Sequence, residues 1–115
     1  FGRLALCDHF RMIAQRIRQE IEPFLNDDLL TKTADNTGLG VRSNRPRVYI
    51  LGSLSGGTGG GMFLDLAYLL KHELRNVGYR NPEVHGLFTG PPADKSTPRA
   101  AAANTFAALT ELSHY

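Results

Sequence analysis

The feature that most constrains this chain is an apolar run followed at once by a glycine-rich segment and then by an apolar helical pattern. Residues 48–51 are apolar and partly β-branched, which predicts a buried strand. Residues 56–61 contain five glycines, and Met62 opens the helical pattern. Glycines permit positive φ angles and close approach of a ligand, and a helix N-terminus offers free N–H groups to an anion. This order predicts a phosphate-binding loop, with a flexible glycine-rich connector as the alternative.

Two common phosphate-binding motifs do not fit these residues. A Walker loop requires a lysine after its last glycine, but here Met62, Phe63 and Leu64 follow the glycines. A dinucleotide fingerprint, G-x-G-x-x-G, counted from Gly57 and Gly59 places Met62 where the third glycine belongs. The loop therefore belongs to neither class.

Residues 53–62, Ser-Leu-Ser-Gly-Gly-Thr-Gly-Gly-Gly-Met, resemble the glycine box of the tubulin and FtsZ family. That box is a G-G-G-T-G-[ST]-G loop between a central strand and a helix. Ser55 stands at the position of the first glycine, and Gly60 replaces a small hydroxyl residue or alanine, which loosens the loop. With Gly2-Arg3-Leu4-Ala5-Leu6 upstream, the sequence is most similar to the divergent bacterial tubulin-like proteins.

The resemblance implies binding of GTP or GDP, with Mg²⁺, through backbone amides of the loop and the Thr58 hydroxyl. It places Gly90-Pro91-Pro92 beside the ribose and matches Asn104 to the asparagine of a Pro-Tyr-Asn-Ala segment, while Ala101 replaces the ribose-binding glutamate. The nucleotide-binding residues that it implies are Ser53, Ser55, Gly56, Gly57, Thr58, Gly59, Gly60, Gly61, Pro91 and Asn104.

No catalytic residue is assigned within the chain. Asp94 is the one side chain near the predicted crevice that is able to act as a base. In tubulin and FtsZ the water-activating residue comes from the next subunit of a filament, so the resemblance implies a homo-oligomer or filament and a possible GTPase. Two alternatives stay open, a non-hydrolysing scaffold that retains the fold and an unrelated α/β enzyme with another phosphorylated ligand.

Length and composition limit the remaining possibilities. The 115 residues allow one domain, and a start at Phe1 and an end in a helical pattern predict that 1–115 is the central part of a GTP-binding domain, incomplete at both ends. A net charge of +2 is too small to indicate a nucleic-acid surface. No signal peptide and no membrane-length apolar run are found, so the cytoplasm is the expected location. Cys7 is expected to be buried rather than reactive.

The N-terminal part of the chain is predicted to be one amphipathic helix followed by a long connection. Apolar residues recur every three or four positions from Leu4 to about Leu25. His9 lies beside the apolar stripe without a second metal ligand at helical spacing. Turn or cap signals recur through 26–46, with a short helix near Leu29 capped by Asp27 or Asp28. We interpret the basic cluster Arg42, Arg45 and Arg47 as a solvated approach to the strand, or else as a partner surface.

The C-terminal part is predicted to alternate helix and strand. A helix over 62–77 ends at Gly78, a strand over 84–89 contains His85, and a helix over 99–114 closes the chain. Two strands joined by a helix form a right-handed parallel crossover. The expected fold class is α/β, a three-layer Rossmann-like parallel sheet fragment in the order helix–strand–glycine loop–helix–strand–helix.

Overall fold

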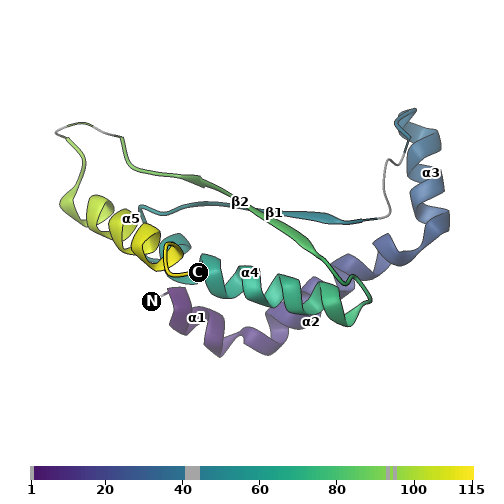
Figure 1. The fold of residues 1–115 in the computed structure, drawn as a ribbon, viewed down its shortest axis with the longest axis horizontal. Coiled ribbons are helices and arrows are strands. Elements are labelled where there is room, and N and C mark those ends of the chain that lie inside the picture. Colours follow the sequence, from purple (N-terminus) through teal and green to yellow (C-terminus); the bar gives the residue numbers. More distant parts are fainter. Residues whose placement is uncertain (1, 41–44, 93, 95) are drawn as a thin grey trace.

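The computed structural model describes residues 2–40, 45–92, 94 and 96–115. Its elements, in chain order, are α1 (Gly2–Asp8), α2 (Phe10–Ile21), the 3-10 helix η1 (Glu22–Leu25), α3 (Asp27–Thr37), β1 (Arg47–Ser53), α4 (Gly59–Asn76), β2 (Glu83–Thr89) and α5 (Arg99–Leu112). Figure 1 shows α4 beneath the two strands, with α1, α2 and α5 packed against it.

The two strands form a parallel sheet, which confirms the α/β class. β1 and β2 pair from Arg47 with Glu83 to Ser53 with Thr89, so their carboxyl ends lie at the same edge. β1 extends the predicted 48–51 by one residue at its start and two at its end, and β2 extends the predicted 84–89 by one residue at its start. Arg47 and Glu83 at the first pair are joined by an ion pair of 2.8 Å. This pair also gives Arg47 an intramolecular partner, and Arg45 is exposed, whereas Arg42 lies outside the described residues.

The sheet has one covered face and one exposed face. Val48 and Ile50 are half-buried on the side of α4, while Tyr49 and Leu51 are 54% and 73% exposed on the other side. Leu87, the pairing partner of Leu51, is 57% exposed as well. In the described part of the chain α4 is the helix that contacts the sheet, and it covers one face, so the second helical layer of a three-layer fold is not among the described residues.

α4 is the centre of the packing. It begins at Gly59, three residues before the predicted start, because the last glycines of the loop already form its first turn. Its buried side chains are Phe63, Leu64, Leu69, Leu70, Glu73 and Leu74. Phe63 and Leu64 join Leu54 and Ala108 in the core, and the ring of Phe88 packs edge-on to Phe63 at 5.0 Å. Because α4 has apolar residues on several sides, it packs against the sheet, α1, α2 and α5 at the same time.

The end of α4 has the hydrogen bonds of a Schellman motif. The Gly78 N–H donates to the Arg75 carbonyl and the Tyr79 N–H to the Leu74 carbonyl, both at 3.0 Å. Gly78 has a φ of 106°, which requires a residue without a Cβ. The predicted stop at this glycine is therefore confirmed, with Val77 as the C-cap one residue before it.

The predicted single N-terminal helix is wrong in one respect, because it is broken at His9. His9 has φ −107° and ψ 11°, outside the helical region, and its ring Nδ1 lies 3.2 Å from the Ala5 carbonyl oxygen. α1 and α2 can therefore follow different directions (Figure 1). Cys7 is exposed on α1, so the expectation that it is buried is also wrong.

The short helix predicted within 26–46 is α3, which begins before Leu29 and covers Asp27–Thr37. The Asn26 side chain accepts a hydrogen bond from the Asp28 N–H at 3.0 Å and caps α3, and Gly38 ends that helix with a φ of 65°. The turn or cap signal at 26–28 is therefore an N-cap, and the capping residue is Asn26 rather than Asp27 or Asp28. None of the described helices is long and apolar enough to cross a membrane.

Candidate functional site

The glycine loop leaves the carboxyl edge of the sheet and enters α4. β1 ends at Ser53, and the Leu54 N–H donates to the Thr89 carbonyl at 3.0 Å, so the loop starts beside the end of β2. The Gly60 N–H donates to the Gly56 carbonyl at 3.1 Å, which closes the first turn of the helix. The carboxyl edge of a parallel sheet is where open α/β folds bind ligands.

Two side chains hold the start of the loop. The Ser55 N–H donates to the Ser53 hydroxyl oxygen at 3.2 Å, and the Asn104 side-chain amide donates to the Ser55 carbonyl at 2.9 Å. Asn104 is half-buried on α5, so this helix positions the loop as well as covering α4. The family resemblance predicted Asn104 as a nucleotide contact. The sequence contained no signal for the hydrogen bond from Asn104 to the loop backbone.

The glycines of the loop are not in left-handed conformations. Among the described residues only Gly38 and Gly78 have a positive φ, so the loop does not use the positive φ angles that its glycines permit. The glycines are needed for space instead. A Cβ on Gly59 would lie closer than 3.0 Å to the Ser53 carbonyl oxygen, and one on Gly60 would lie 3.0 Å from the Leu54 carbonyl oxygen. Gly60 thus allows close packing rather than loosening the loop.

The outer part of the loop is open. A Cβ on Gly56 or on Gly57 would meet no protein atom within 4 Å. Thr58, the N-cap of α4, is exposed and makes no side-chain capping hydrogen bond. The first turn of α4 contains no acidic residue. An anion at this helix N-terminus would therefore meet amides, one hydroxyl and the positive end of the dipole, without a like charge from that turn.

The second loop at this edge follows β2. Pro91 is half-buried, and a Cβ on Gly90 would lie 4.0 Å from the Thr105 methyl group, so the loop approaches α5. The Asp94 carboxylate accepts hydrogen bonds from the Ser96 hydroxyl at 2.5 Å and the Ser96 N–H at 2.9 Å. These bonds hold the pKa of Asp94 below its ordinary value. A carboxylate so stabilised is a weak base, which disfavours Asp94 as a catalytic group.

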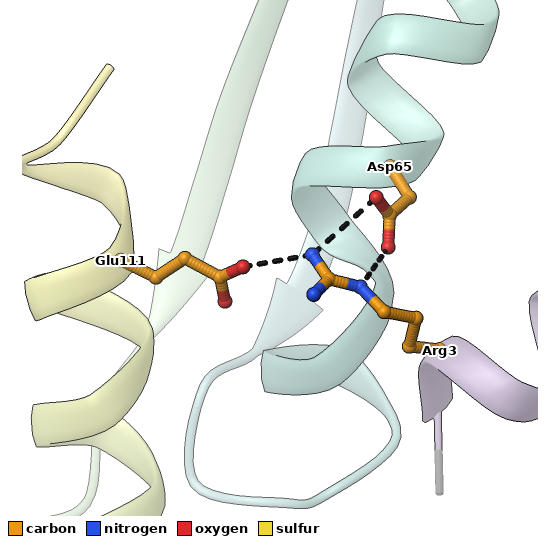
Figure 2. A network of polar contacts seen from close by, with 3 residues as sticks. All are labelled: Arg3, Asp65 and Glu111. Carbon is orange, nitrogen blue, oxygen red and sulfur yellow. Dashed lines mark hydrogen bonds and ion pairs between the residues drawn. The ribbon is translucent and has the colours of Figure 1, made fainter.

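An ion-pair network joins the three helices beside the loop (Figure 2). Arg3 of α1 donates from Nε to Asp65 of α4 at 2.6 Å and from Nη2 to Glu111 of α5 at 2.8 Å. These two carboxylates raise the pKa of Arg3, chiefly through the hydrogen bond to Asp65. Arg3 lay in the segment that carried the family resemblance, but nothing in the sequence paired it with residues 62 and 108 positions away.

Histidines and acidic side chains do not form a metal cluster in the part of the chain that the structure describes. No group of three or more His, Cys, Asp or Glu residues is placed there to hold an ion. His85 is exposed on β2, where its ring stacks on Tyr49 with the ring centres 5.2 Å apart. His9 is exposed at the helix break, as expected of a surface histidine.

The fold and the loop define an α/β protein with a glycine-rich turn at the carboxyl edge of its parallel strands. Comparison with protein families identifies the group more closely: the model described as "Tubulin like" matches residues 1–115. The chain therefore belongs to the tubulin-like family, and the resemblance stated from the glycine box is confirmed. Neither the search of curated proteins nor that of solved structures found a match.

Proposed function

We propose that this chain is the central part of a GTP-binding domain and that residues 56–61 bind the phosphates of GTP or GDP. The amides of the loop and the Thr58 hydroxyl would contact phosphate oxygens, and Pro91 would border the nucleotide from the neighbouring loop. The Thr58 hydroxyl would help to hold Mg²⁺, which when bound with the phosphates would neutralise part of their charge. The selectivity for guanine over other bases is inferred from family membership alone.

One observation carries the proposal, namely that the loop is fixed from behind and open in front. Ser53 and Asn104 bond its first turn, and Gly59 fits against the Ser53 carbonyl. Gly56, Gly57 and Thr58 are exposed at the N-terminus of α4. A preformed row of donors of this kind binds an anion without first having to be ordered, which favours affinity.

Two valine substitutions test the assignment by separating the front of the loop from its back. Gly57→Val places its side chain in open space, so it should block the phosphates while leaving the melting temperature of the nucleotide-free protein unchanged. Gly59→Val meets the Ser53 carbonyl and should lower both GTP affinity and stability. Thr58→Ala should weaken binding by about 1 kcal/mol or somewhat more, the contribution of one hydrogen bond to a charged group.

The measurement is calorimetric titration of GTP into the full-length protein that contains this chain. Wild-type affinity in all three variants would show that the loop does not bind phosphate. A wild-type protein that binds no nucleotide would instead favour a scaffold role, with which the absence of a carboxylate at Ala101 agrees.

We further propose that any GTP hydrolysis by the full-length protein depends on self-association. Phosphoryl transfer to water needs a group that positions the water, and Asp94 is held as a weak base by Ser96. The expected result is turnover per molecule that rises with protein concentration and is unchanged in Asp94→Asn. Turnover that is independent of concentration in the monomeric range, or that Asp94→Asn abolishes, would place the catalytic group within one molecule.

A further inference from the structure

The start of α1 packs directly against the glycine loop. Gly2 is buried, and a Cβ added to it would lie 2.8 Å from the Gly57 carbonyl oxygen and closer still to that of Thr58. A Cβ on Gly61 would in turn lie 3.5 Å from the Gly2 Cα. Backbone therefore meets backbone here, and residue 2 has no room for a side chain.

The residue after Gly2 fixes α1 in this place. Arg3 binds Asp65 of α4 and Glu111 of α5, so one guanidinium ties together the helix that begins at the loop and the helix that carries Asn104 (Figure 2). Arg3 presents a rigid fork of donors, which suits simultaneous binding of two carboxylates. Its side chain is 54% exposed, so the network fixes geometry more than it adds stability.

We propose that the first turn of α1 is a platform that sets the position of the phosphate-binding loop, with Gly2 as the contact and Arg3 as the clamp. Both are positioning residues, because they act on the carbonyl side of Gly57 and Thr58 and leave the exposed side free for the ligand. The proposal rests on the proposed function, since it assigns these residues to phosphate binding. A shift of the loop away from α1 would also strain the Asn104 bond to Ser55 on the other side.

The test combines GTP titration with hydrogen exchange of the nucleotide-free, full-length protein. Gly2→Ala should lift the loop and lower GTP affinity about tenfold, the effect of losing one hydrogen bond to a charged group. It should speed amide exchange in the peptide covering 55–61 and leave the strand peptide 84–89 unchanged. Gly40→Ala is the matched control, because a Cβ there meets nothing within 4 Å, and it should alter neither measurement.

Arg3→Gln is a second variant that adds no atom between α1 and the loop. It tests whether α1 positions the loop if Gly2→Ala does not fold. It should speed exchange in the same peptide and lower GTP affinity about threefold, less than Gly2→Ala because the ion pairs are exposed. Wild-type exchange over 55–61 in the folded variants, or faster exchange with unchanged GTP affinity, would overturn the platform. A wild-type protein that binds no GTP would refute the proposed function, and the exchange measurement would still decide the contact between α1 and the loop.

Discussion

Replacing Asn104 by alanine should weaken GTP binding although the side chain faces the loop backbone. The variant removes the 2.9 Å hydrogen bond from the Asn104 amide to the Ser55 carbonyl. A partly buried, neutral hydrogen bond contributes about 1 kcal/mol, so the affinity should fall roughly fivefold if the bond is needed to hold the binding conformation. Asn104→Asp should lose more, because its carboxylate cannot donate and would place an oxygen against the carbonyl oxygen.

The assay is calorimetric titration of GTP into the full-length protein, with hydrogen exchange of the nucleotide-free form beside it. Asn36→Ala, on the exposed surface of α3 and distant from the loop, is the matched control. Support of the loop requires faster exchange around Ser55 in Asn104→Ala before any nucleotide is added. An affinity within a factor of two of wild type, or an affinity loss without a change in exchange, would refute this reasoning, the latter in favour of a direct contact with the nucleotide.

Three further predictions concern stability. Arg18 of α2 forms an ion pair with the buried Glu73 of α4, and its guanidinium lowers the pKa of Glu73 below the ordinary value of 4.5. The ion pair therefore stabilises the folded state above pH 4.5, and this effect is lost as the pH falls through the lowered pKa. Glu73→Gln should therefore lower the melting temperature near pH 7 and differ less from wild type toward pH 3, while an equal difference at both pH values would contradict the ion pair. Leu74→Ala should lower the free energy of unfolding by about 2–5 kcal/mol because the side chain is completely buried. The exposed Leu39→Ala should leave that free energy almost unchanged, and denaturant titration measures both variants. The 115 residues expressed alone should melt without a sharp transition because one face of the sheet is exposed, and a steep, reversible melt of the monomer would disprove this.

Local patterns were sufficient to predict the central unit of the fold. The apolar run before the glycines, the apolar sides of 62–77 and the stop at Gly78 each depend on neighbouring residues, and all appear as β1, α4 and its C-cap. The sequence predicted a short helix near Leu29 but not the full length of α3 or its Asn26 cap, because Asn, Asp and Gly are as common in turns as in the caps of a helix. The break at His9 was missed because the apolar stripe runs on through it.

For the candidate site as well, the sequence predicted local features and not the contacts between distant segments. The glycine-rich spacing indicated the loop and its place at the start of a helix, but not why each residue is glycine. Gly59 is required by the Ser53 carbonyl and Gly2 by the carbonyls of Gly57 and Thr58, and these are contacts between segments that only the folded chain brings together. Asn104 likewise reaches Ser55 from 49 positions away. Sequence periodicity carries no information about such pairs, whose geometry depends on tertiary packing.

The Arg3 network also orders events during synthesis on the ribosome. Arg3 leaves the exit tunnel long before Glu111, which is 108 positions later in the chain. At about 5–20 residues per second, Glu111 is synthesised roughly 5–20 s after Arg3. Asn104 is synthesised only shortly before Glu111. The strand pair and α4 can form in that interval, while the loop between them still lacks its last supports. A nascent chain stalled before α5 should therefore contain the βαβ unit without a nucleotide-binding loop in its final shape.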